Sequence, residues 1–140
     1  MRYMFIVSGP ENLAEYGTPP AEMHEAMGRL MEEAMNEGKI VSFGGLKPTA
    51  RASRMRITKG KIITTDGPFT EAKEVIGGFC IYNLASKEEA LAELHKFMEL
   101  HRTYWPKWEG QVELREMYEA EDDVRETQIE ASRELEQARR

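Results

Sequence analysis

The sequence has one cysteine, no long apolar run and no excess of basic residues, and each of these absences excludes a class of protein. Cys80 is the single cysteine among 140 residues, so an internal disulfide is excluded and we expect a reducing compartment. No apolar run approaches the ~20 residues that a membrane helix needs. The first apolar stretch, YMFIV, is short and is followed directly by polar residues, which favours a strand over a signal peptide. We therefore expect a cytoplasmic protein without a membrane partner.

The charge balance argues against nucleic acid as a partner. Lys and Arg total 19 against 25 Asp and Glu, which gives a formal net charge of −6. Domains that bind nucleic acid carry dense basic patches, and none stands out here. The length of 140 residues and the apolar fraction of 41% instead fit one globular domain with its own core.

The hydrophobic pattern predicts strands and helices in a defined order. Apolar runs rich in β-branched residues predict strands, and apolar residues spaced three and four apart predict helices. The predicted strands are residues 3–7, 39–43, 55–58, 61–65, 75–84 and 112–118, and the predicted helices are residues 19–37 and 87–104. Two helices with an antiparallel type of sheet, and a hairpin at Lys59-Gly60, indicate an α+β fold of the ferredoxin-like kind.

Two of the predicted strands, 3–7 and 75–84, show no polar side. When helices cover one face of an antiparallel sheet, the other face is commonly polar because it meets water. An apolar second face must be covered as well, and two sheets packed face to face in a dimer achieve this. The sequence therefore predicts a homodimer.

The first predicted helix carries a row of methionines, Met23, Met27, Met31 and Met35. Their four-residue spacing places them on one helix face. Such a row is either part of the core or an adaptable binding surface, and core packing is the favoured interpretation.

The composition changes near residue 119. Residues 120–140 contain no Gly, Pro or aromatic residue and consist largely of helix formers and charged residues. We therefore divide the chain into a domain over residues 1–119 and a charged helical C-terminal extension over residues 120–140. The extension is either a solvated helix, which is favoured, or a helix that docks on a partner subunit.

Residues 66–74, with the sequence DGPFTEAKE, combine turn-forming residues with several charged residues. Asp-Gly-Pro forms turns, so Asp66 could have a purely structural role. Four charged residues fall within these nine positions, and the segment leads into a strand with the paired glycines Gly77 and Gly78. The glycines predict a bulge or a close backbone approach. Loops held by a sheet collect binding groups, so the segment is predicted to form the rim of a pocket.

The stretch DGPFTEAKEVIGGF resembles the signature of DGPF-domain proteins, a branch of the YCII-related family. The segments RYMFIVSG, EGKIVSFGGLKPTA and VELREMYE support this resemblance, which covers about residues 1–119. The resemblance implies a ferredoxin-like domain assembled as a dimeric α+β barrel. It also implies an active-site His–Asp pair and a link to alternative sigma factors, beside which DGPF members are often encoded. No reaction is established for most of the family.

The resemblance makes His24 and Asp66 the candidate catalytic residues. His24 matches the helix histidine of the family and borders the methionine row. Placed against Asp66, it would form a general acid/base pair suited to proton transfer near neutral pH. The alternative for His24 is a helix-surface residue without a partner. His95 and His101 are expected to face solvent.

The same segment supplies four candidate ligand-binding residues, Phe69, Glu71, Lys73 and Glu74. Phe69 is either the wall of an apolar site or, as favoured, the anchor that holds the loop to the core. Glu71, Lys73 and Glu74 could bind a polar ligand or pair with each other across the loop, and Lys73 could bind an anionic group. A solvated run of charges is the favoured interpretation. The ligand would be a small molecule of unknown identity.

Two functions remain open at this point. In the first, the protein is a small-molecule enzyme that uses His24 and Asp66. In the second, it is a non-catalytic ligand-binding or regulatory module, which could signal through its C-terminal helix. We expect neither a metal nor a cofactor, because no metal-ligand spacing, phosphate loop or nucleophile elbow occurs in the sequence.

Overall fold

A computed structural model describes residues 1–11, 17–119 and 124–140 of the chain. The strands are β1 (Arg2–Gly9), β2 (Ile40–Gly45), β3 (Ser53–Thr58), β4 (Lys61–Asp66), β5 (Val75–Asn83) and β6 (Gln111–Glu116). The helices are α1 (Ala21–Asn36), α2 (Lys87–Tyr104) and α3 (Val124–Ala138), and a short 3-10 turn, η1, spans Thr49–Arg51. The predicted order of strands and helices in the domain is confirmed.

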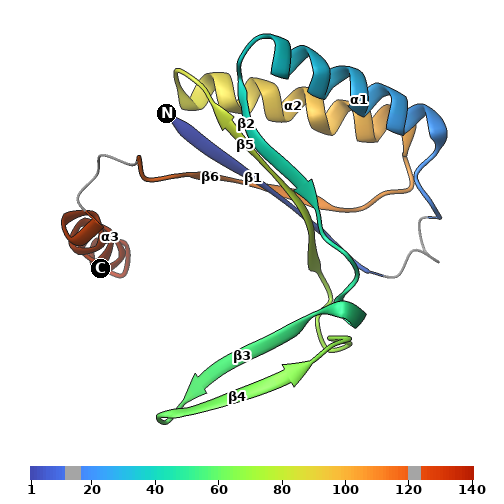
Figure 1. Cartoon of the computed structure of the whole chain (residues 1–140). Coiled ribbons are helices and arrows are strands. Elements are labelled where there is room, and N and C mark those ends of the chain that lie inside the picture. Colours follow the sequence, from blue (N-terminus) through green and yellow to red (C-terminus); the bar gives the residue numbers. More distant parts are fainter. Residues whose placement is uncertain (12–16, 120–123) are drawn as a thin grey trace.

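Four strands form an antiparallel sheet in the order β2-β5-β1-β6. The helix α1 connects β1 to β2, and α2 connects β5 to β6, so each connection passes over an intervening strand. Both helices lie on the same face of the sheet (Figure 1). The protein is therefore an α+β protein, and this strand order is compatible with a ferredoxin-like arrangement.

Local sequence signals place the helix ends. The hydroxyl of Ser86 accepts a hydrogen bond from the backbone N–H of Glu89 at 3.1 Å, and the Glu89 carboxylate accepts one from the backbone N–H of Ala85 at 3.0 Å. This reciprocal capping satisfies N–H groups that have no partner within the helix. Gly38 follows α1 with a φ of 70°, a left-handed conformation that ends helices and favours glycine.

The core lies between the helices and the covered face of the sheet. Tyr3, Phe5 and Tyr82 are almost fully buried, and the rings of Phe5 and Tyr82 lie 4.7 Å apart between centroids. The methionine row of α1 joins this core in part, because Met23 and Met31 are buried while Met35 at the end of the row is 49% exposed. The core interpretation of this row is therefore correct except at its last member.

The opposite face of the sheet is apolar along its two central strands, β1 and β5, while Glu113 and Arg115 of the edge strand β6 pair with Ile6 and Met4 and add charges to it. Met4 pairs with Ile81 and Ile6 pairs with Phe79, and directly paired residues of an antiparallel sheet lie on the same face. These four side chains alternate with the core residues along β1 and β5, so they face away from α1 and α2. No described helix covers this side (Figure 1). The sequence-based expectation that the strands over residues 3–7 and 75–84 have no polar side is confirmed.

A β-bulge interrupts β5 at the paired glycines. Val7 pairs with Gly78 and Ser8 pairs with Ile76, so Gly77 is an extra residue on β5. A Cβ atom added to Gly78 would lie only 3.0 Å from the carbonyl oxygen of Gly44 on β2. The first glycine therefore forms the bulge and the second allows the close approach of two strands, as the sequence predicted.

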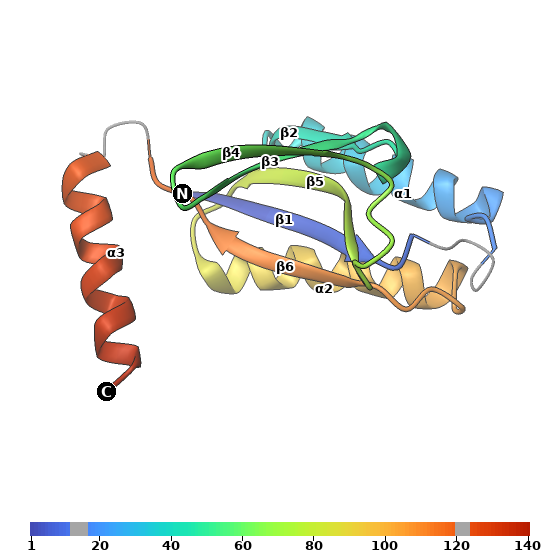
Figure 2. The ribbon, with the colours of Figure 1, turned by 90° about the horizontal axis from the view of Figure 1, so that it is seen from below.

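The strands β3 and β4 form a separate two-stranded sheet. This hairpin turns at Lys59 and Gly60, which have positive φ values of 51° and 79°, as the prediction for the hairpin requires. It leaves the four-stranded sheet on the side without helices and passes across that face at a distance (Figures 1 and 2). Every residue of both strands is exposed.

The C-terminal extension contains the helix α3, which stands apart from the sheet (Figure 2). Ile129 and Leu135 on this helix are 44% and 63% exposed. The predicted extension begins at residue 120, and residues 120–123 lie outside the described part of the chain. Among the described helices, none combines the length and the hydropathy that a membrane crossing needs.

Candidate functional site

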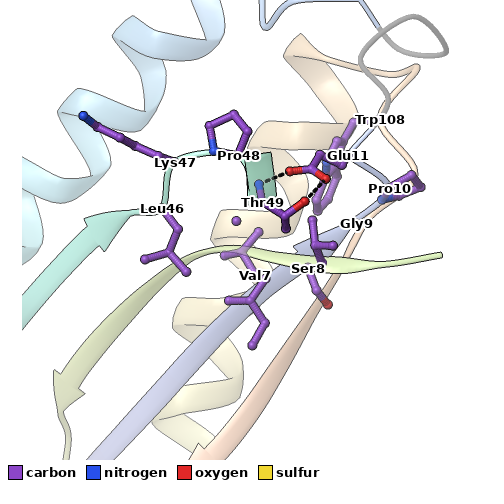
Figure 3. Close-up of a pocket in the computed structure, with 13 residues that line it drawn as sticks. Val7, Ser8, Gly9, Pro10, Glu11, Leu46, Lys47, Pro48, Thr49 and Trp108 are labelled. Carbon is purple, nitrogen blue, oxygen red and sulfur yellow. Dashed lines mark hydrogen bonds between the residues drawn. The ribbon is translucent and has the colours of Figure 1, made fainter. Parts of the chain in front are cut away.

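A pocket opens where the ends of β1 and β2 meet the start of β5 (Figure 3). Its volume is about 230 Å³. Apolar side chains form most of its wall, and polar side chains are gathered toward β1 and the η1 turn. The apolar lining residues are Val7, Pro10, Leu46, Pro48, Val75, Ile76 and Trp108, and the polar or charged ones are Ser8, Glu11, Lys47 and Thr49. This combination of apolar wall and few polar groups is typical of a small-molecule site.

Two hydrogen bonds join Glu11 to Thr49 in this pocket (Figure 3). The Thr49 hydroxyl donates to Glu11 Oε2 at 2.6 Å, and the Thr49 backbone N–H donates to Glu11 Oε1. These bonds, first from the side chain and then from the backbone, lower the pKa of Glu11. Lys47 also lines the pocket but extends away from Glu11 (Figure 3). Glu11 therefore gives the pocket a negative charge in a fixed position.

Trp108 forms one wall of the pocket and continues into a buried aromatic stack. Its ring centroid lies 4.4 Å from that of His101, which lies 4.6 Å from that of Phe97. His101 is 8% exposed and its Nδ1 atom lies 2.9 Å from the carbonyl oxygen of Phe97. The prediction that His101 faces solvent is therefore wrong, because the end of α2 turns this ring under Trp108. His95 is exposed as expected.

The DGPF segment is fixed beside the pocket through the η1 turn. The Thr49 hydroxyl accepts a hydrogen bond from the backbone N–H of Phe69 at 3.2 Å, and the backbone N–H of Gly67 donates to the carbonyl oxygen of Ala52 at 2.8 Å. Thr49 therefore contacts both Glu11 and the segment. The segment itself stays behind this turn, because none of residues 66–74 lines the pocket of Figure 3.

The predicted ligand-binding residues of the segment have different positions. Phe69 is 6% exposed, and the Arg54 guanidinium carbon lies 3.7 Å from its ring centroid, which agrees with the anchor interpretation. Glu71 is exposed and accepts a hydrogen bond from Arg54 at 2.7 Å. A hydrogen bond with its own backbone and then this bond lower the pKa of Glu71. Lys73 and Glu74 are exposed. Their binding roles stay predictions.

The structure does not bring the two predicted catalytic residues together within one chain. His24 is exposed in the first turn of α1. Asp66 ends β4, where its Oδ1 atom accepts a hydrogen bond from the Ser53 hydroxyl at 2.8 Å. Neither residue lines the pocket of Figure 3. The acid/base role of the pair stays a prediction without a contact to support it.

A second pocket of about 250 Å³ adjoins the first. It lies between α1 and the sheet, and the two pockets share Val7 and Gly77. Its side-chain lining is apolar apart from the thiol of Cys80, whose pKa is raised to about 11 by burial. The other residues that line it are Phe5, Val7, Met27, Met31, Phe43, Gly44, Gly77, Gly78, Phe79 and Phe97. The first pocket therefore carries a negative charge at Glu11, and the second pocket, which shares two lining residues with it, is apolar.

Sequence reasoning missed Glu11 and Thr49. Glu11 follows a strand and the turn-forming pair Gly9-Pro10, and Thr49 follows Pro48, so both stand in loops directly after predicted strands. That position is a general signal for binding residues. The contact between the two loops, 38 residues apart, is set by the sheet order and has no local signal in the sequence.

Metal binding has no support in the described ranges of the chain. No group of three or more His, Cys, Asp or Glu side chains in these ranges is placed to hold a metal ion.

Comparison with known proteins gives the family. The model of the YCII-related domain matches residues 1–98. The chain belongs to the YCII-related family. A curated relative, the uncharacterized protein R00369 of Rhizobium meliloti (strain 1021), is 37% identical over 62 residues, which are 44% of this chain. The match spans about half the length of that relative. Glu11, Thr49 and the DGPF segment all lie inside the family match.

We predict that Gly67→Ala destabilises this YCII-related protein. An added Cβ atom would lie 1.7 Å from the Thr49 carbonyl oxygen, so the backbone of the segment or of η1 must move. Overpacking of this kind costs about 1–3 kcal/mol of unfolding free energy, measurable by urea denaturation. Gly77→Ala is the control, because a Cβ atom there meets nothing within 4 Å. Equal losses in the two variants would contradict the prediction.

We predict that His101 makes stability depend on pH. Burial lowers the pKa of His101, so the unfolded chain binds a proton at a pH where the folded chain does not, and stability falls as pH drops through the unfolded pKa of about 6.5. The unfolding free energy of His101→Gln should therefore fall less between pH 7.5 and pH 5.5 than that of the wild type. His95→Gln, at an exposed site, should keep the wild-type slope. A wild-type slope in His101→Gln would refute this role.

Proposed function

We propose that this YCII-related protein binds a small molecule in the pocket of Figure 3, with Glu11 as the polar anchor. The observation that carries the proposal is the Glu11 carboxylate, held by two hydrogen bonds from Thr49 in a pocket with mostly apolar walls. A carboxylate held in this way loses little freedom when it binds a ligand, because its position is already set.

The two adjoining pockets define the chemical class of the ligand. Each carboxylate oxygen of Glu11 can accept more than the one hydrogen bond that Thr49 donates. A ligand group at this end is therefore a donor, and an amine adds the attraction of opposite charges. The apolar pocket beyond Val7 and Gly77 suits a hydrocarbon or aromatic body. We therefore propose a ligand with an apolar body and a cationic or hydrogen-bond-donating head.

The proposal includes a two-copy assembly. The helix-free face of the sheet presents the apolar side chains of Met4, Ile6, Phe79 and Ile81. Monomeric proteins seldom leave a large contiguous apolar face in water. Two ferredoxin-like domains that pack these faces together would form the dimeric α+β barrel expected from the resemblance to DGPF proteins.

Two roles are compatible with such a ligand. Catalysis by His24 and Asp66 would require an arrangement that brings them to the pocket, since each is exposed and neither lines it. A non-catalytic regulatory role is favoured by α3, which stands apart from the domain with apolar side chains exposed, as a partner-binding element would (Figure 2). The proposed link to alternative sigma factors belongs to this second role.

The proposed function is tested by a thermal-shift series with phenylalkylamines of increasing chain length and phenylalkanoates of the same carbon skeletons. A bound ligand raises the melting temperature of the folded state. We expect the amines to stabilise the wild type more than the acids do, and Glu11→Gln to lose most of this response because the negative charge is gone. Chemical conversion of a bound amine into a different, released compound would favour an enzyme over a regulatory module.

The control is Glu32→Gln, which removes an exposed carboxylate on α1 outside the pocket. It should keep the wild-type response to every compound. An equal response of wild type and Glu11→Gln to the amines would contradict Glu11 as the anchor. A series in which no compound with an apolar body stabilises the wild type would contradict the proposed ligand class.

A further inference from the structure

The two faces of the β3–β4 hairpin differ in chemistry. Met55 pairs with Thr64 and Ile57 pairs with Ile62, which places three large apolar side chains on one face. On the other face, Arg54 pairs with Thr65 and Arg56 with Ile63. Met55, Ile57 and Ile62 are 76%, 74% and 70% exposed. Three of the most exposed large apolar side chains of the described chain therefore share one face of one hairpin.

An isolated hairpin of this kind lacks a source of stability. Two-stranded hairpins are at best marginally stable in water, and they gain stability from packing against a third element. The structure anchors the base of the hairpin, where Ser53 bonds Asp66 and Arg54 lies over Phe69, but the strands beyond it are exposed on both sides. The apolar face of Met55, Ile57 and Ile62 therefore lacks a packing partner within the described chain.

The charge of the hairpin fits an acidic partner. Residues 53–65 contain four basic residues, Arg54, Arg56, Lys59 and Lys61, and no acidic residue. The chain as a whole has a formal charge of −6, so the rest of the chain carries −10. A second copy of this chain therefore carries the opposite net charge to the hairpin, and opposite net charges favour association.

The position of the hairpin also fits a second copy. It leaves the sheet on the side without helices, which is the side that the apolar residues Met4, Ile6, Phe79 and Ile81 occupy (Figure 1). A second copy packed on that face must meet the hairpin. A two-fold axis would make each hairpin reach the other copy in the same way.

We propose that the β3–β4 hairpin is an arm that grips a second copy of this chain with the face formed by Met55, Ile57 and Ile62. The inference rests on the two-copy assembly proposed above and adds the element that holds it. The arm buries an apolar face that the single chain leaves in water, while Arg54 and Arg56 on the opposite face stay outside the contact.

The test compares isoleucines on opposite faces of the hairpin, Ile57 and Ile62 on one face and Ile63 on the other. Ile57→Thr/Ile62→Thr replaces two apolar ethyl branches of the proposed contact with hydroxyl groups while keeping β-branched side chains in the strands. Ile63→Thr makes the same kind of change on the basic face. We expect the double variant to raise the dimer Kd at least about 30-fold and Ile63→Thr to change it by less than about 3-fold, measured by sedimentation with fluorescence detection.

A second measurement uses the unmodified protein and does not depend on how the variants fold. Amide hydrogen exchange of residues 53–66 should slow at concentrations above the wild-type dimer Kd and become fast on dilution, because the arm is covered only in the dimer. Exchange that is fast at every concentration would overturn the arm.

The outcomes separate this inference from the proposals on which it builds. A wild-type dimer whose Kd is unchanged in Ile57→Thr/Ile62→Thr overturns the arm and leaves the face-to-face assembly in place. A wild type that sediments as a single copy overturns both. The thermal-shift test of Glu11 with phenylalkylamines measures ligand binding, and its outcome does not depend on either of these results.

Discussion

The structure depends on a sheet whose two central strands are apolar on both faces while helices cover only one. On the covered face, Tyr3, Phe5 and Tyr82 pack beneath α1 and α2. On the other face the side chains at alternate positions, Met4 and Ile6 among them, have no helix over them in the described chain. The hydrophobic effect acts on both surfaces alike, so a fold that buries one face and leaves the other half-buried lacks part of its stabilisation. This imbalance is the physical reason to consider the chain as half of an assembly.

Thr49 connects the parts of the chain that matter for the candidate site. Its hydroxyl donates to Glu11 in the loop after β1 and accepts from the backbone of Phe69 in the DGPF segment. The segment therefore acts on the pocket through Thr49, because it lies behind the turn and does not line the pocket. Gly67 is required for this packing, since any side chain there would collide with the Thr49 carbonyl group. A sequence signature can thus support a site that it does not itself form.

The sequence contained enough information for the fold and too little for the site. Alternating apolar patterns, the Ser86 cap and the Gly77-Gly78 bulge are local signals, and the structure confirms each of them. The contact of Glu11 with Thr49 depends on strand order, which no local pattern encodes. The prediction that His101 faces solvent is wrong for a related reason. Its helical position does not reveal that the chain after α2 returns to stack Trp108 on it.

The central claim is that the helix-free face of the sheet is covered by a second copy of the chain. Sedimentation equilibrium of the wild-type protein tests this most directly, because it reports mass without reference to shape. The account predicts the mass of two chains at micromolar concentration, with a reversible decrease on dilution. A single mass of 16.1 kDa at every concentration would contradict it, since the apolar face would then remain in water.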